Sequence, residues 1–220
     1  MKIVIISDNH KQWLGDLPQA DMLIHAGDAC LGGGFKELKE FSKHVKENYN
    51  FKYKLFIPGN HDRCFEENEA QARGILKDWI VMINQGIGIE GTNFWGSPVT
   101  PPFENWAFNW EDKERKELWD KIPVSANSKG NTNILITHGP PKGIMDTVLK
   151  PSGPFMREEH VGCPFLAERI KHLDIKYHIF GHIHGCHGHK EVNGVHYINT
   201  SMLDERYQKH TNYKYYEIEI

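Results

Sequence analysis

The chain has 220 residues, of which 39% are hydrophobic and 25% are charged, and its formal net charge is −3. These values exclude a disordered or fibrous protein, and the slight negative charge argues against long duplex nucleic acid as a partner. A chain of this length buries enough surface to fold without a disulfide or a structural metal, so we expect any bound metal to be functional.

The start of the chain shows no sign of export. Its apolar run ends at Ile6, which is too short for the core of a signal peptide, and no later segment approaches the roughly 18 apolar residues of a membrane span. The four cysteines form no CxxC pair, which favours reduced thiols. We therefore expect a cytoplasmic protein with no membrane partner.

The first part of the chain alternates strand and helix patterns. Short apolar runs rich in β-branched residues predict strands at 2–7, 22–26, 53–57 and 79–83. Between the second and third of these, apolar residues at helical spacing predict a helix over 35–45. This alternation is typical of an α/β protein.

The second part begins irregularly and then returns to the same alternation. Residues 86–98 and 99–110 are rich in Gly, Pro and aromatic residues and predict a turn and an irregular loop, before a charged surface helix over 112–122. A helix is expected over 165–173. The remaining predicted strands are at 133–137, 177–180, 192–200 and 213–220. No linker or repeat divides the chain, so we expect a single domain over residues 1–220.

Short polar clusters follow five of the predicted strands. Because ligands bind at the carboxyl ends of the strands in open α/β sheets, we expect the five clusters to share one site. They read Ser7-Asp8-Asn9-His10, Gly27-Asp28, Gly59-Asn60-His61-Asp62, Thr137-His138-Gly139 and Gly181-His182-Ile183-His184.

The side chains in these clusters suit divalent metal ions. Asp, Asn and His without soft sulfur ligands favour ions such as Mn²⁺, Fe, Zn²⁺, Co²⁺, Ni²⁺ or Mg²⁺, and the DxH and HxH spacings place two ligands on one side of an extended strand end. Seven candidate ligands are too many for one site that keeps an open position, so two metals are the economical interpretation. The candidates are Asp8, His10, Asp28, Asn60, His138, His182 and His184.

Each of these residues also has an ordinary structural interpretation. Asp8 and Asp28 are placed where aspartates cap helices, and a single histidine in a loop is more often merely polar than a ligand. His187 and His189 extend the histidine cluster as either substrate contacts or solvated loop residues. The aromatic loop 94–110 is expected to pack more than to stack on a nucleobase.

Taken together, the five clusters resemble the motif series of the calcineurin-like metallophosphoesterase superfamily. Trp95-Gly96-Ser97-Pro98 and His138-Gly139-Pro140-Pro141 further resemble its MPPED-type metallophosphodiesterase branch. The resemblance spans residues 8 to 184. It implies a four-layer α/β/β/α sandwich of two mixed sheets flanked by helices, and activity on phosphodiesters such as 2′,3′-cyclic nucleotides.

The resemblance also implies a role for each residue. Asp8, His10 and His184 would hold one metal, Asn60, His138 and His182 would hold the other, and Asp28 would bridge them. A hydroxide bridging the metals would attack the phosphorus in line, and His61 would protonate the leaving group as general acid. Asp62, the next residue, is expected to orient the His61 ring without itself being catalytic.

Other substrate contacts and functions stay open. Asn60, His61 and Arg63 are candidate substrate contacts, although Arg63 can equally form a surface salt bridge. The predicted partner is a small phosphodiester, and the sequence leaves the oligomeric state open. The alternatives are a phosphomonoesterase or a nuclease on short nucleic-acid ends with the same centre, or a non-catalytic protein-binding scaffold.

Overall fold

The computed structural model describes residues 1–123, 132–210, 213 and 215–220. Its first sheet has the strand order β13-β1-β2-β3-β4, in which β1 to β4 run parallel and β13 pairs with β1 in the antiparallel direction. The strands are β1 (Lys2–Ile6), β2 (Met22–His25), β3 (Tyr53–Phe56), β4 (Ile80–Val81) and β13 (Tyr216–Glu219).

The second sheet has the strand order β11-β12-β10-β7-β6-β5. Its four central strands are parallel, and the two edge strands β11 and β5 are antiparallel to their neighbours. The strands are β5 (Gln85–Ile89), β6 (Thr92–Ser97), β7 (Thr132–Thr137), β10 (Tyr177–Phe180), β11 (Gly188–Val192) and β12 (Val195–Asn199).

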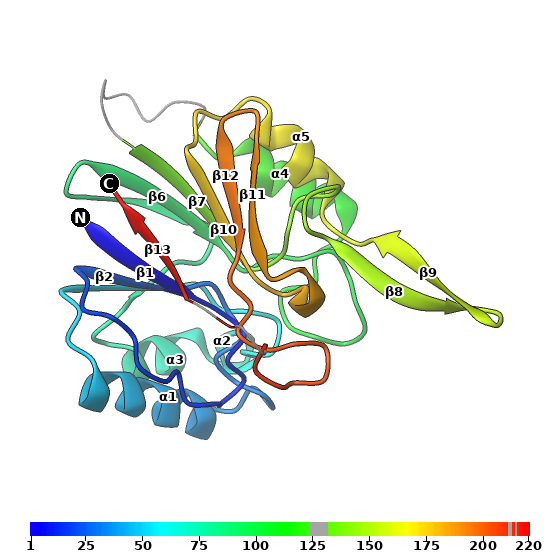
Figure 1. The fold of residues 1–220 in the computed structure, drawn as a ribbon. Coiled ribbons are helices and arrows are strands. Elements are labelled where there is room, and N and C mark those ends of the chain that lie inside the picture. The colour runs from blue at the N-terminus through cyan, green and yellow to red at the C-terminus, as the bar shows by residue number, and fades with distance from the viewer. Residues whose placement is uncertain (124–131, 211–212, 214) are drawn as a thin grey trace.

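A separate two-stranded hairpin and six helical segments complete the described chain. The hairpin projects away from the two sheets (Figure 1) and consists of β8 (Thr147–Ser152) and β9 (Phe155–His160). The helices are α1 (Phe35–Asn48), α2 (Cys64–Glu67), α3 (Glu69–Ile75), α4 (Asp112–Asp120), α5 (Pro164–Ile170) and the 3₁₀ turn η1 (His184–Cys186). Among the described residues, no helix has both the length and the apolar composition that a membrane span requires.

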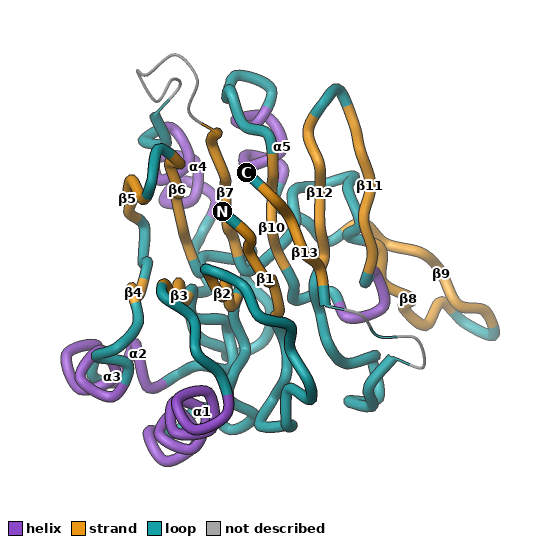
Figure 2. The backbone as a smooth tube through the Cα atoms, turned by 60° about the vertical axis from the view of Figure 1, so that its left-hand side comes forward, coloured by secondary structure: helices purple, strands orange, loops and turns teal. Residues whose placement is uncertain are grey.

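Alternating side chains of the strands sort into three separate cores. Ile3 and Ile5 of β1 face the second sheet, where they pack in one cluster with Ile136 of β7. The intervening Val4 and Ile6 pack in another cluster with side chains of α1. A third cluster lies between the second sheet and helices α4 and α5. The order helix, sheet, sheet, helix (Figures 1 and 2) confirms the expected four-layer sandwich.

Helices α1, α4 and α5 form where the sequence pattern places them, whereas α2 and α3 were not predicted. Leu38, Phe41 and Val45 form the buried face of α1, as their spacing predicts. Helix α4 begins with a capping box between Glu111 and Glu114, which satisfies backbone N–H groups at its first turn. Helices over 35–45, 112–122 and 165–173 were therefore predicted at the correct places.

Two strand pairs differ from the sequence prediction. The β5–β6 hairpin occupies most of residues 86–98, which were predicted as a turn and an irregular loop. The hairpin was missed because Gly86 and Gly88 lack the side chains that would mark β5 as a strand. The hairpin of β8 and β9 was not predicted, since its residues are mostly exposed and carry no apolar alternation. The strand predicted at 79–83 has only the two residues of β4.

The two sheets meet at the carboxyl ends of their parallel strands. A bridge between Ser7 and Ser201 joins the chain just after β1 to the chain just after β12. The backbone N–H of Asp8 donates to the carbonyl of Gly27 at 2.8 Å, which holds the ends of β1 and β2 together. The five polar clusters of the sequence therefore lie at one junction between the sheets.

Candidate metal centre

The seven candidate ligands lie together at this junction. Asp8 and His10 follow β1, Asp28 follows β2, Asn60 follows β3, His138 follows β7, and His182 and His184 follow β10. Six of the seven are buried and His182 is half-buried. Both sheets thus contribute polar side chains to one desolvated site.

The backbone is strained at four of these residues. Asp8, His10, Asp28 and His182 have φ values of 51°, 39°, 61° and 69°. This left-handed region is unfavourable for residues other than glycine, and such strain gathers at functional sites because surrounding structure must hold it. Here the strain turns each side chain from its strand end into the junction.

Two glycines allow the carboxylates to approach neighbouring backbone. A Cβ on Gly59 would clash with Asp28 Oδ1, and a Cβ on Gly181 would clash with Asp8 Oδ2 and Ser7 Oγ. The glycines of the sequence clusters therefore leave space that the two aspartates fill.

Asp8, His10 and His184 form a first group of ligand atoms, all within 4.8 Å of one another. His10 Nδ1–H donates to the Cys30 carbonyl at 3.0 Å and His184 Nδ1–H donates to the Asp204 carbonyl at 2.9 Å. Since carbonyls only accept, these bonds leave a lone pair on each Nε2. The two Nε2 atoms nevertheless lie 3.2 Å apart.

Asn60, His138 and His182 form a second group. Asn60 Oδ1 lies 2.8 Å from His138 Nε2 and 2.8 Å from His182 Nδ1. His138 Nδ1–H donates to the Ala26 carbonyl at 3.0 Å, so its Nε2 faces the junction and presents a lone pair there when the ring is neutral.

Asp28 lies between the two groups. Its Oδ2 is 3.7 Å from His10 Nε2 in the first group and 3.4 Å from His138 Nε2 in the second. Its Oδ1 accepts the backbone N–H of His61 at 2.7 Å, which fixes the carboxylate. This is the position that a bridging ligand requires.

The buried carboxylates of the junction favour positive charge beside them, as the pKa values of their neighbours show. Burial alone would raise the pKa of Asp8, but His184, His138 and His10 hold it well below its usual range. Burial would lower the pKa of His138, yet the Asp28 carboxylate and then Asp8 outweigh this and raise it to about 9. Both shifts reflect the attraction between the buried carboxylates and the histidines packed against them.

The donor set fits divalent cations. The Nε2 atoms of His10 and His184 face one another, and Nε2 of His138 faces two acceptors, the oxygens of Asn60 and Asp28. Such contacts are unfavourable unless a proton or a metal ion lies between the acceptors. Nitrogen and oxygen ligands are typical of a metal site, and so is the orientation of His10, His138 and His184 by backbone carbonyls.

His61 lies beside the ligands with its ring fixed. Its Nδ1–H donates to the Leu31 carbonyl at 2.7 Å, and a ring nitrogen lies within 4.8 Å of ligand atoms of His10 and Asp28. Trp106 stacks on this ring, with centroids 3.9 Å apart and planes inclined by 27°. Tyr207 lies 4.9 Å from the His10 ring and 5.4 Å from the His184 ring.

Four of these neighbours were not identified from the sequence. The carbonyls of Cys30, Leu31 and Asp204 orient histidines through backbone atoms, which leave no residue pattern. Tyr207 follows β12, outside the five clusters, and nothing in its neighbourhood marks it. Trp106 was identified only as one member of the aromatic loop.

Asp62 differs from its expected role. It was expected to hold the His61 ring, but its carboxylate instead accepts backbone N–H groups of Asp28, Cys30 and Gly59 at 2.8–2.9 Å. It therefore joins the loops that follow β2 and β3. Arg63 lies at the start of α2, with its guanidinium carbon 5.9 Å from the Trp106 ring centroid.

Other histidines lie outside the two groups of ligands. His25 is in the core, where its Nε2 bonds Asn9 Oδ1 at 2.9 Å. His187 stacks on His210 at 5.0 Å, and His189 contacts His196 at 3.1 Å between ring nitrogens.

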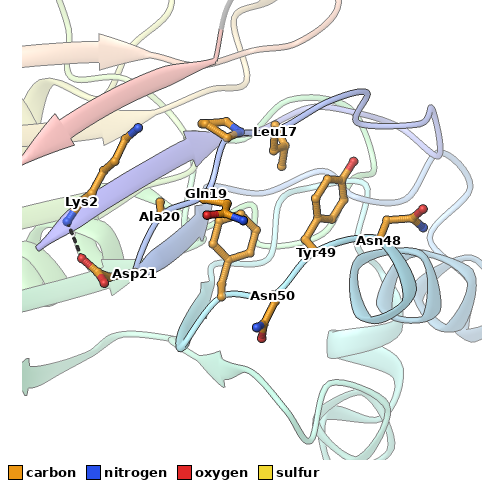
Figure 3. Close-up of a pocket in the computed structure, with 10 residues that line it drawn as sticks. Lys2, Leu17, Gln19, Ala20, Asp21, Asn48, Tyr49 and Asn50 are labelled. Carbon is orange, nitrogen blue, oxygen red and sulfur yellow. Dashed lines mark hydrogen bonds between the residues drawn. The ribbon is translucent and has the colours of Figure 1, made fainter.

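A hollow of about 580 Å³ lies elsewhere, at the amino ends of β1 and β2. Figure 3 shows its lining, including Lys2, Asp21 and Tyr49, with the backbone N–H of Lys2 donating to Asp21. None of its ten lining residues belongs to the five clusters. We do not associate it with the chemistry of the junction.

Comparisons with known proteins match the region that builds the junction. The family model described as calcineurin-like phosphoesterase matches residues 1–186, which include all seven candidate ligands and His61. A Caenorhabditis elegans UPF0046 protein is 30% identical, covering 96% of this chain and 73% of its own length. Human metallophosphoesterase domain-containing protein 1 is 29% identical, covering 94% and 68%. A solved archaeal phosphodiesterase aligns over 99% of both chains with 18% identity and a TM-score of 0.44.

Proposed function

Because the chain belongs to the calcineurin-like phosphoesterase family, we propose that it is a dinuclear-metal phosphoesterase that hydrolyses phosphodiester bonds of small nucleotides, such as 2′,3′-cyclic nucleotides. The observation that carries this proposal is the convergence of nitrogen and oxygen lone pairs from both sheets on one buried junction. Such a junction has no evident structural purpose without cations.

The ligands divide between two metal ions. Asp8, His10 and His184 would hold the first, Asn60, His138 and His182 would hold the second, and Asp28 would contact both. When bound, the two ions activate a water nucleophile and withdraw charge from the phosphoryl oxygens during in-line displacement. Two divalent ions would bring four positive charges, and the chain supplies only two carboxylates, Asp8 and Asp28, against them. The metal-loaded site would therefore attract an anionic phosphoester.

His61 is the proton donor to the leaving group. Its Nδ1–H donates to the Leu31 carbonyl, so Nε2 is the nitrogen that can donate a proton to the substrate. A proton delivered from Nε2 neutralises the alkoxide that forms when the P–O bond breaks, a contribution of about 10²–10⁴ in rate. Arg63 and the Asn60 amide are the further candidate contacts to phosphate.

The side chains around the site support a nucleotide as the substrate. Tyr207 is 39% exposed and its ring lies against His10 and His184. An aromatic face at the opening of a phosphoesterase site can stack on a base, which contributes about 1–3 kcal/mol.

The test is turnover by metal-stripped protein to which Mn²⁺, Ni²⁺, Zn²⁺ or Mg²⁺ is returned. The substrates are bis-p-nitrophenyl phosphate, p-nitrophenyl phosphate, and 2′,3′- and 3′,5′-cyclic AMP. We expect metal-dependent cleavage of diesters with a 2′,3′-cyclic preference, and no turnover by Asp28→Asn. Asp146→Asn, which alters a buried carboxylate outside the junction, is the matched control.

The other outcomes separate the alternatives. A preference for p-nitrophenyl phosphate would identify a phosphomonoesterase, and cleavage only of short oligonucleotides would identify a nuclease. No turnover with any metal would contradict enzymatic function and favour a protein-binding scaffold.

A further inference from the structure

The Trp106 indole covers one face of the His61 ring. The two ring centroids are 3.9 Å apart, and the planes are close to parallel at 27°. Trp106 is half-buried, whereas His61 is only 7% exposed. The indole therefore separates the imidazole from solvent on that side.

The loop that carries Trp106 is fastened directly beside His61. The backbone N–H of Ala107 donates to the carbonyl of Asn60 at 3.2 Å, so the residue after Trp106 is bonded to the residue before His61. The next N–H, of Phe108, donates to Glu66 Oε1 at 2.9 Å. Ala107 and Phe108 are buried in the core under α1 and α3. These contacts fix the indole relative to the imidazole.

The remaining sides of the imidazole are also held. Its Nδ1–H donates to Leu31, its edge meets the His10 ring at 82° with centroids 4.6 Å apart, and its backbone N–H is bonded to Asp28. The single hydrogen bond at Nδ1 still permits the ring to swing about the N–H···O direction. The Trp106 indole lies flat against the face of the imidazole, so it blocks this rotation sterically.

We infer that Trp106 is a positioning residue that holds the His61 imidazole at the orientation in which Nε2 reaches the leaving-group oxygen. This inference rests on the proposed function of the same site. Trp106 acts through His61 and neither transfers a proton nor binds a metal ion. A misplacement of about 1 Å in a catalytic group can cost about 100-fold in rate, so a loosened ring costs turnover without changing the chemistry.

The kinetic test compares leaving groups. In Trp106→Leu we expect kcat for 2′,3′-cyclic AMP, which releases an alkoxide, to fall about 10- to 100-fold with KM within about threefold. For bis-p-nitrophenyl phosphate, whose leaving group needs little protonation, kcat should change less than about threefold. Trp106→Phe, which keeps an aromatic face, should recover most of the loss.

A double-mutant cycle shows whether Trp106 acts through His61. Adding Trp106→Leu to His61→Ala should cause no further loss, because the group that it positions is already absent. Trp13→Leu is the matched control, since Trp13 also contacts a histidine, His44, at 4.3 Å between centroids, but outside the site. It should leave both kcat values unchanged.

A spectroscopic test does not depend on turnover. In the metal-free protein, the stacked indole should shift the His61 ring-carbon protons upfield in a histidine-labelled NMR spectrum, and Trp106→Leu should abolish that shift. The His61→Ala variant assigns the signals. If wild-type protein shows the shift but hydrolyses no substrate, the stacking stands while the proposed function, and the catalytic role of Trp106 with it, is wrong.

Three results would overturn the inference. One is a His61 spectrum that is unaltered by Trp106→Leu. Another is a raised KM with unchanged kcat on both substrates, which would mean that Trp106 contacts the substrate itself. The third is a further additive loss in the double mutant.

Discussion

Gly181 packs so closely against Asp8 that we expect a substitution of this glycine to impair metal binding, as a substitution of a ligand would. In Gly181→Ala the new methyl group would overlap Asp8 Oδ2 and Ser7 Oγ, so the carboxylate must move away from the first group of ligand atoms. We expect metal affinity and kcat/KM to fall at least about 10-fold, the lower limit seen when an outer contact of a metal ligand is lost. Metal content after dialysis and steady-state kinetics measure both.

Gly74→Ala is the control for this substitution. Gly74 lies in α3, and a Cβ there would meet no atom within 4 Å. Alanine in a helix interior is more favourable than glycine, so this variant should gain about 0.5–1 kcal/mol in the free energy of unfolding and keep its metals. Equal metal affinity in the two variants would contradict the tight fit assigned to Gly181.

His178 makes the folded protein sensitive to acid. Burial lowers its pKa to about 3, whereas an unfolded histidine titrates near 6.5. Between these values the unfolded state binds more protons, so stability falls as pH falls. In His178→Gln the amide can still donate to Thr137 Oγ1. Between pH 7 and pH 5 the free energy of unfolding of this variant should fall by about 2 kcal/mol less than that of the wild type.

Urea unfolding of the metal-free proteins at the two pH values measures this difference. His172→Gln is the control, because the His172 side chain is 64% exposed. It should follow the wild-type decline. The same decline in His178→Gln would show that His178 does not cause it.

For single residues, the sequence predicts which side chains build the candidate site better than it predicts which backbone groups orient them. All seven candidate ligands were identifiable because each occupies a short cluster after a strand. The Leu31 carbonyl that holds His61 was not identifiable, since any residue offers a carbonyl. Asp62 was assigned to the imidazole because it follows His61, but its bonds to backbone N–H groups depend on how two loops approach one another.

Among the elements, predictability follows burial. The strands β1, β2, β3, β7 and β10 were predicted because both of their faces are buried between a sheet and helices. The hairpin β8–β9 has little buried surface, so its residues follow no apolar pattern, and Pro151 in β8 argues against a strand. The β5–β6 hairpin is intermediate, with an exposed edge strand beside a buried one.

Gly96 tests how tightly β6 packs between the sheets. A Cβ at this position would overlap the Ile57 side chain and lie 2.8 Å from Met82 Cβ, in the core between the layers. Gly96→Ala should therefore lower the free energy of unfolding by about 1–3 kcal/mol, the usual cost of overpacking. Gly88→Ala, in the exposed partner strand, would meet Asn93 Oδ1 only at 3.7 Å.

Urea unfolding compares the two glycine variants. Gly88→Ala should differ from wild type by less than about 0.5 kcal/mol, as exposed substitutions usually do. Similar losses in both variants would mean that alanine acts through strand backbone conformation instead of through packing between the sheets.

At the scale of the molecule, the candidate metal centre lies where the two sheets meet. Asp8, His10, Asp28 and Asn60 follow strands of the first sheet, and His138, His182 and His184 follow strands of the second. The confirmed four-layer fold places these strand ends at one junction. Ions held there are bound by the folded chain and not by the unfolded one, so they stabilise the whole molecule.

Adding metal should therefore raise the melting temperature, and a chelator should reverse the rise. At a free metal concentration of about 100 times Kd, one site adds about 2.7 kcal/mol, which corresponds to roughly 5–10 °C for a chain of this size. Asp28→Asn should abolish most of the rise measured against its own metal-free form, because the variant lacks the carboxylate expected to contact both ions. Asp146→Asn should keep the full rise. Calorimetry with and without Mn²⁺ measures these shifts, and an undiminished rise in Asp28→Asn would exclude Asp28 as a shared ligand.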